Sequence, residues 1–184
     1  MRRTTLTLMA AAIVVTALAP AAASDAPTPG QIARKQIDAG AARDWQTLRT
    51  LYAADVRYVD PNGEAHGVDA AINAIERTLK PFGVVKVAIA KVYEGKDFAV
   101  VEWSTTAINS AEITLADGSQ AGPTGNEVKL DIVTIYDIKD GRISSERNYY
   151  DALNLYGSLG LLGDYVRLTD HRVIEAGCDD ASDE

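Results

Sequence analysis

The sequence predicts an α+β protein in which three helices cover the concave face of a curved, mostly antiparallel sheet. Apolar residues follow a helical period through most of residues 31–79. The period then changes to two, which is typical of strands. The later strands are joined by short turns, so neighbouring strands are expected to run antiparallel. A sheet with helices on one face is an α+β layer arrangement.

The first part of the predicted domain is mainly helical. From Gln31, apolar residues keep helical spacing as far as Gly40, a residue that commonly ends a helix. Asp44 is a suitable N-cap for a second helix, whose apolar stripe extends to Tyr52. A third helix is expected over residues 68–79, because Pro and Gly follow it closely.

The remaining chain is predicted to form the sheet and a short C-terminal helix. Alternating apolar residues predict strands over 56–60, 84–93, 97–108, 128–138 and 142–150. Tight turns are expected at residues 60–63 (DPNG) and 139–141 (KDG). Residues 110–127 are polar and turn-rich, which indicates a loose hairpin or a long loop. The final helix is expected over roughly residues 151–160.

Composition restricts the classes of function. The 184 residues are 47% hydrophobic and 24% charged, the balance of an ordinary globular domain. The net charge of −8 argues against nucleic acid as a partner, because binding to phosphates requires clustered Lys and Arg. With one Cys and two His, a disulfide framework and the common zinc sites are excluded. We therefore expect no metal site and no cofactor.

The N-terminal segment has the features of a secretory signal peptide over residues 1–23. Arg2 and Arg3 precede an apolar run over residues 6–19, and small residues follow that run. The run is short for a membrane-spanning helix. We therefore expect an exported protein, periplasmic or secreted, that is not held in a membrane after cleavage.

The mature chain is expected to have three parts. Residues 24–30 are a short leader, residues 31–162 form one domain, and residues 163–184 form an acidic, disordered tail. About 130 residues are enough for one domain with a hydrophobic core. Cys178 lies in the tail with no basic neighbour, so we expect an inert thiol.

Two segments carry a family resemblance: residues 51–67 (LYAADVRYVDPNGEAHG) and 141–160 (GRISSERNYYDALNLYGSLG). They resemble the SnoaL-like branch of the nuclear transport factor 2-like superfamily, which includes ketosteroid isomerase, limonene-epoxide hydrolase and polyketide cyclases. The resemblance implies a cone-shaped fold over residues 31–162 with a conical cavity between helices and sheet. It also implies a small hydrophobic molecule as the partner, and a homodimer formed through the outer face of the sheet.

The resemblance also selects the strand face that lines the cavity, which alternation alone leaves open because both faces are partly apolar. The residues that it places inside are Tyr58, Asp60, Trp103, Thr105, Thr134, Asn148 and Tyr150. The aromatic residues among them, with Tyr136, would form an apolar lining or simply part of the core. His66 precedes Gly67 in a pair common in the family, and we expect it to be structural.

Asp60 is the residue expected to carry chemistry. It resembles the general base of ketosteroid isomerases, which stands in the same Asp-Pro-x-Gly setting. A carboxylate in an apolar cavity is a better base than one in water, and it can take a proton from carbon or oxygen. A structural alternative is that Asp60 only begins the turn at Pro61.

The other acids that these families use are absent from the matching positions. The isomerase oxyanion would need a Tyr near Gln36 and an acid where Thr134 stands. The epoxide hydrolases use an Asp–Arg–Asp set, and the matching positions here are Thr105, Trp103 and Asn148. The polyketide cyclases have an acid at the position of Asn148. Glu102 and Glu146 have no obvious partner and are expected at the surface, so Asp60 would be the only carboxylate in the cavity.

Two functions from different classes remain open after this reasoning. The first is an isomerase, cyclase or hydratase that uses Asp60 as a general base on a small, largely apolar molecule. The second is a non-catalytic module of the same fold that binds a small ligand or another protein. The sequence is compatible with an enzyme and with a binding module, and a cavity beside Asp60 would favour a small-molecule function.

Overall fold

The computed structural model describes residues 26–114 and 118–162. The predicted signal peptide, the acidic tail and Cys178 lie outside the described residues, as does the first part of the leader. The elements, in chain order, are α1 (Pro29–Ala42), α2 (Trp45–Leu51), β1 (Tyr52–Asp60), β2 (Gly63–His66), α3 (Val68–Leu79), β3 (Lys86–Glu94), β4 (Phe98–Ile108), β5 (Ile113–Thr114), β6 (Gln120–Ala121), β7 (Glu127–Lys139), β8 (Arg142–Tyr150) and α4 (Ala152–Ser158).

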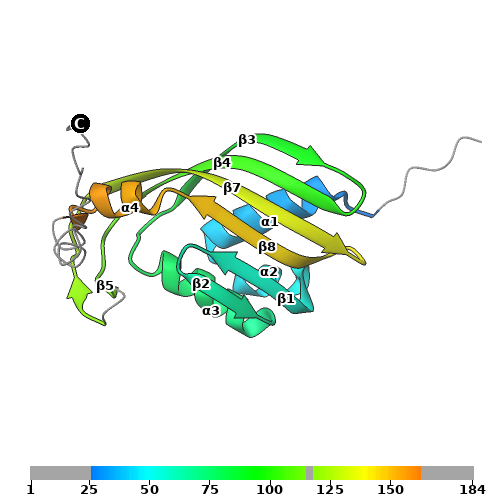
Figure 1. Cartoon of the computed structure of the whole chain (residues 1–184), viewed down its shortest axis with the longest axis horizontal. Coiled ribbons are helices and arrows are strands. Elements are labelled where there is room, and N and C mark those ends of the chain that lie inside the picture. The colour runs from blue at the N-terminus through cyan, green and yellow to red at the C-terminus, as the bar shows by residue number, and fades with distance from the viewer. Residues whose placement is uncertain (1–25, 115–117, 163–184) are drawn as a thin grey trace, which may run out of the picture.

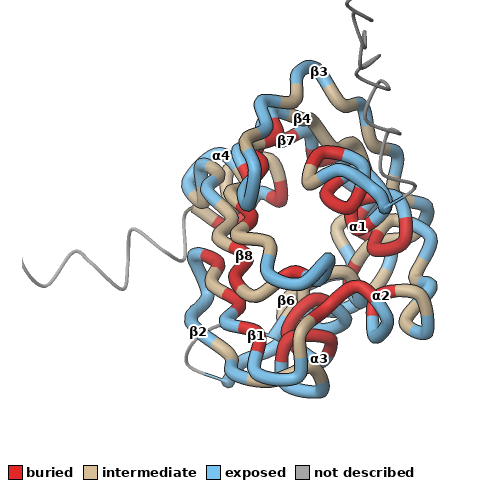
Figure 2. The backbone as a smooth tube through the Cα atoms, turned by 90° about the vertical axis from the view of Figure 1, so that its right-hand side faces the viewer, coloured by how far each residue is buried: buried red, intermediate tan, exposed pale blue. Residues whose placement is uncertain are grey.

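The main sheet has six strands in the order β2-β1-β8-β7-β4-β3. Every neighbouring pair is antiparallel except β1 and β8, which run parallel. Helices α1, α2 and α3 lie along one side of the curved sheet, and α4 lies near one end of β7 (Figure 1). Seen end-on, the strands and these three helices surround a common interior (Figure 2). The predicted α+β class is confirmed.

Local signals determine where the first two helices begin. Thr28 caps α1 through a reciprocal pair of hydrogen bonds with Gln31, and Pro29 occupies the first turn, where its missing N–H costs nothing. Asp44 accepts the Thr47 backbone N–H and so caps α2, as the sequence predicts. The buried face of α1 includes the polar Gln36, which the apolar spacing alone did not distinguish.

Two details differ from the prediction. Tyr52 begins β1 instead of ending α2, and residues 63–66 form a further edge strand, β2. Tyr52 belongs to the sheet because it pairs with Ile143 of β8. The strand β2 follows from the turn at Pro61 and Asn62, where the Asn62 N–H donates to the Asp60 carboxylate at 2.7 Å. This turn allows β2 to pair back on β1 with Asp60 opposite Gly63.

The core divides into two clusters. The larger lies between the helices and the sheet, and its fully buried side chains include Leu48, Tyr52, Val56, Val101 and Ile143. A smaller cluster joins β7 to α4 and includes residues of the hairpin β5–β6 at its edge. Trp103 packs against both clusters. Among the described residues no helix is both long and apolar enough to span a bilayer.

Arg43 connects the end of α1 to the segment after α3. Its Nη2 donates to the backbone oxygens of Leu79, Phe82 and Gly83 at 3.0, 2.6 and 3.1 Å. Arg43→Ala should lower the free energy of unfolding by about 2 kcal/mol, because three carbonyls lose a charged donor. The left-handed backbone at φ 56° is equally unfavourable for Ala, so it does not affect the comparison.

Urea denaturation measures this effect, with Arg34→Ala on the exposed face of α1 as the matched control. Equal stability of the two variants would show that the Arg43 contacts contribute nothing.

Candidate functional site

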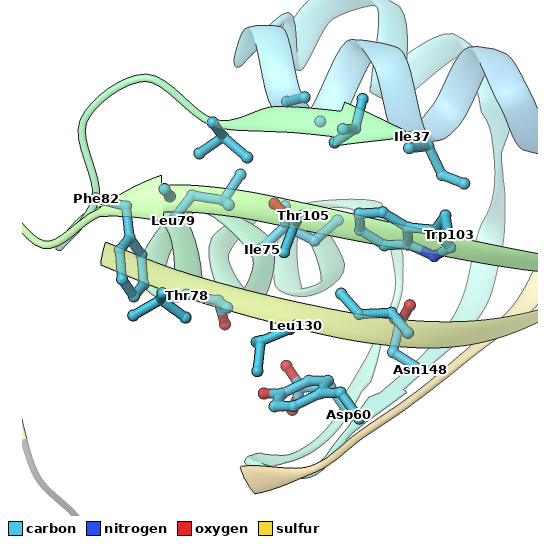
Figure 3. Close-up of a pocket in the computed structure, with 18 of the residues that line it drawn as sticks. Ile37, Asp60, Ile75, Thr78, Leu79, Phe82, Trp103, Thr105, Leu130 and Asn148 are labelled. Atoms are coloured by element: carbon cyan, nitrogen blue, oxygen red, sulfur yellow. The ribbon is translucent and has the colours of Figure 1, made fainter. Parts of the chain in front are cut away.

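A cavity of about 140 Å³ lies between α1, α3 and the inner face of the sheet, where the two core clusters meet. Most of its wall is apolar (Figure 3). The apolar side chains of the wall include Ile37, Ile75, Leu79, Phe82, Val85, Val87, Leu130, Ile132 and Leu155. The side chains of the wall that carry a polar group are Gln36, Tyr58, Asp60, Thr78, Trp103, Thr105, Glu146, Asn148 and Tyr150.

The structure brings together six of the seven residues that the sequence analysis places in the cavity. Thr134 is the exception, because it has no exposed surface and does not line the cavity. Its hydroxyl accepts a hydrogen bond from Trp103 Nε1 at 2.9 Å and donates one to Asn148 Oδ1 at 2.7 Å. Thr134 therefore orients two residues of the wall from behind.

Thr134→Val tests this positioning role. The change keeps the shape but leaves Trp103 Nε1 and Asn148 Oδ1 without their buried partner, so we expect a loss of about 2 kcal/mol in the free energy of unfolding. Denaturation followed by Trp fluorescence measures it. Thr134→Ser should retain most of the stability, and Thr106→Val, at a partly exposed position on β4 outside the cavity wall, is the matched control. If Thr134→Val and Thr106→Val are equally stable, the Thr134 hydroxyl positions nothing.

Asp60 is the last residue of β1 and is 8% exposed. One carboxylate oxygen accepts the Asn62 backbone N–H at 2.7 Å, and the other accepts the Tyr58 hydroxyl at 3.2 Å. In Figure 3 it lies at the edge of the cavity below Leu130. Asp60 therefore both stabilises the turn and lines the cavity, because the turn holds its carboxylate at the end of β1 on the inner face of the sheet.

Glu146 is a second carboxylate in the wall, and the expectation that it lies at the surface is wrong. Glu146 is only 3% exposed. Its Oε2 accepts the Tyr52 hydroxyl at 2.6 Å, and its Oε1 accepts Asn148 Nδ2 at 3.0 Å and Gln36 Nε2 at 3.3 Å. Burial raises the pKa of Glu146 to about 7, although the donors from Tyr52 and Asn148 oppose the shift.

The signal that could have found Glu146 is the alternation within β8. Glu146 has the same parity as Asn148 and Tyr150, which the resemblance placed inside. Its partners come from elements distant in sequence, so no local pattern revealed them. In the sheet it lies opposite Tyr58 on β1 and Tyr136 on β7.

Behind Glu146, a chain of hydrogen bonds links buried polar groups of the helix layer and the sheet. Tyr136 donates to Gln36 Oε1 at 2.8 Å, and Gln36 Nε2 donates to the Tyr52 hydroxyl at 3.0 Å. Tyr136 is fully buried and does not line the cavity, so of its two predicted roles the structure shows core packing. Burial raises the pKa values of Tyr52 and Tyr136 well above the ordinary range, which keeps both hydroxyls protonated.

The remaining predicted residues are placed as follows. Tyr150 lines the cavity, and its hydroxyl accepts Asn62 Nδ2 at 3.1 Å. Burial raises the pKa of Tyr150 to about 12. His66 is exposed and contacts Glu64 on the same edge strand, away from the cavity. Asp151, at the start of the expected C-terminal helix, caps α4 by accepting the Asn154 N–H.

The chemistry available in this cavity is proton transfer in an apolar setting. It offers the carboxylate of Asp60 and, a short way along the wall, a carboxyl group whose pKa lies near neutrality. Within residues 26–114 and 118–162, no three or more His, Cys, Asp or Glu side chains gather in a group that could hold a metal ion.

Comparison with known proteins agrees with this architecture. A family model described as SnoaL-like domain matches residues 33–146. No curated protein matches the sequence.

Several solved structures share the fold. A protein of Catenulispora acidiphila with a ketosteroid isomerase-like fold, solved in complex with trimethylamine, is 23% identical, covers 75% of this chain and 98% of its own, and superposes with a TM-score of 0.62. An LEH-like epoxide hydrolase of M. tuberculosis is 19% identical, and the match covers 78% of this chain and 96% of the hydrolase, with a TM-score of 0.55. TsrD of Streptomyces laurentii is 19% identical, and the match covers 71% of this chain and 93% of TsrD, with a TM-score of 0.59. At these identities the likeness shows the fold alone.

Proposed function

This chain belongs to the SnoaL-like domain family, and we propose that it binds a small, largely apolar molecule in its cone and catalyses proton transfer on it with Asp60 as general base. Isomerisation, cyclisation and hydration are the reaction classes that such a transfer serves. The observation that carries the proposal is the Asp60 carboxylate on the wall of a mostly apolar cavity.

Glu146 is a second carboxyl group that could take part in this chemistry. It lines the same cavity, and its pKa of about 7 means that it can either hold or release a proton at neutral pH. A base that takes a proton and a nearby acid that supplies one are the two parts of a proton-transfer reaction. The protonated form of Glu146 could supply a proton to the ligand while Asp60 takes one.

A specific observation favours the second candidate, a module that binds the molecule without converting it. At the positions that the family resemblance matches to acids of related enzymes, this chain has the neutral Thr105, Thr134 and Asn148. The Thr134 hydroxyl is engaged by Trp103 and Asn148 and does not line the cavity. Binding alone requires only the cavity and its apolar wall.

Native mass spectrometry of the purified protein tests the shared part of both candidates. We expect a non-covalently bound small molecule on the wild type and none on Leu130→Trp, whose indole would fill the cavity near its centre (Figure 3). Lys129→Trp, the exposed neighbour on β7, is the matched control and should retain the ligand. Retention of the molecule by Leu130→Trp would contradict binding in the cone.

We also propose that the mature protein acts after export, on the strength of the signal-peptide features in residues 1–23. N-terminal sequencing of the protein recovered from a bacterial periplasm or culture medium tests this proposal. A mature N-terminus close to residue 24 is expected, and a chain that stays in the cytoplasm with its original N-terminus would contradict it.

A homodimer through the outer face of the sheet is the third part of the proposal. Val133 and Tyr149 face each other there on β7 and β8 and are 37% and 54% exposed. Light scattering of the purified protein should give twice the mass of the mature chain. Val133→Lys should shift that mass to one chain, because a buried charge opposes association.

A further inference from the structure

The two carboxylates of the cavity have no cationic partner among the described residues. Asp60 accepts hydrogen bonds from Tyr58 and Asn62, and Glu146 accepts them from Tyr52, Gln36 and Asn148. All five partners are neutral, and neither acid belongs to any of the ion pairs that the described residues form. The cavity wall contains no Lys, Arg or His.

This arrangement is unusual, because carboxylates that are removed from water are normally compensated by a cation. Asp60 and Glu146 are 8% and 3% exposed, and they lie on the adjacent strands β1 and β8. The charge of Asp60 disfavours a second negative charge nearby, and so contributes to the raised pKa of Glu146. A positive charge placed in the cavity would compensate the desolvated carboxylates and reduce the repulsion between them.

The rest of the wall suits the apolar part of such a ligand. Trp103, Tyr150 and Phe82 present aromatic surface, which attracts cations as well as hydrocarbon. The indole N–H of Trp103 is already bonded to Thr134, so this ring offers the ligand only its apolar surface. An apolar cavity of about 150 Å³ holds a molecule the size of benzene, so the volume of about 140 Å³ fits a molecule of about one ring.

We propose that the cone binds a small organic cation, an amine with an apolar body of about one ring, whose ammonium group lies beside Asp60 and Glu146. The proposal rests on the proposed function, small-molecule binding in the cone, and adds the charge of the ligand to it. The family resemblance by itself implies only a small hydrophobic ligand and leaves its charge open.

Three probes of nearly equal shape test the charge: cyclohexylmethylamine, cyclohexylmethanol and cyclohexanecarboxylate, measured at pH 8. The chain has two Trp residues, so Trp45→Phe leaves Trp103 in the cavity wall as the only fluorescent indole. Titration of this variant should show the amine binding at least about tenfold more tightly than the alcohol. The carboxylate should bind most weakly, because it meets two like charges.

Two variants in the same background assign the preference to the acids. Asp60→Asn and Glu146→Gln should each lower the amine-to-alcohol affinity ratio about fivefold or more, because each removes one negative charge from the wall. Asp55→Asn on β1 and Glu102→Gln on β4 remove the same charge at exposed positions outside the wall, and the ratio should stay unchanged. Circular dichroism confirms folding, and a variant that fails to fold leaves the other to decide.

The outcomes separate this inference from the proposed function. Equal affinity for amine and alcohol, or an unchanged ratio in both cavity variants, would overturn the cation proposal and leave small-molecule binding intact. Failure of all three probes to bind would count against both. A ratio that falls in the cavity variants and not in the exposed controls supports the cation site.

Discussion

Asp60→Asn should lower kcat for conversion of the bound molecule by about 10²–10⁴-fold, because an amide cannot act as a general base. The side chain keeps its shape and its Oδ1, so it can still accept the Asn62 backbone N–H that organises the turn. The fold is therefore expected to survive while the chemistry is lost. The measurement uses the molecule identified by native mass spectrometry, at saturating concentration, so that weaker binding does not disguise the effect on kcat.

The exposed Asp55 on the same strand provides the control. Asp55→Asn makes the same chemical change outside the cavity and should retain wild-type kcat. If Asp60→Asn also turns over at the wild-type rate, Asp60 is not the base. If the wild type shows no conversion of a molecule that it binds tightly, the non-catalytic candidate replaces the enzyme.

Glu146→Gln should change how stability depends on pH. The pKa of Glu146 is raised from 4.5 to about 7 in the folded protein, so between these values the folded state holds a proton that the unfolded state has lost. This group therefore stabilises the fold fully below pH 4.5, and the stabilisation is lost as pH rises to about 7. The contribution of Glu146 to the free energy of unfolding changes in total by about 3 kcal/mol. A Gln side chain does not titrate, so the variant lacks this change.

Urea denaturation at pH 5 and pH 8 measures this prediction as a difference between wild type and variant. The free energy of unfolding of the wild type, relative to Glu146→Gln, should fall by about 3 kcal/mol or slightly less over that interval. Taking the difference removes contributions from the other titrating groups. Glu102→Gln at an exposed position is the control and should show no such change. A pH-independent difference for Glu146→Gln would mean that Glu146 titrates as an ordinary acid.

The elements could be predicted because their causes are local. Alternation in residues 128–138 predicts β7 to within one residue at each end, and Asp44 and Asp151 cap the helices expected after them. The resemblance placed Asp60 on the inner face, and the structure puts it in the wall of a cavity. Tyr52 was misassigned because its apolar face suits a helix stripe and a strand equally well.

The sequence by itself predicted the α+β class and most of the helices and strands in their order, and the family resemblance placed Asp60 on the inner face. Only the tertiary structure decided that Glu146 lies inside and that Thr134 lies behind the wall. The reason is physical: the surroundings of Glu146 come from α1, β1 and β8, up to 110 residues apart in the chain. Burial and the hydrogen-bond donors from distant elements together determine the protonation state of Glu146. The alternation of residues within one strand contains no information about either of them.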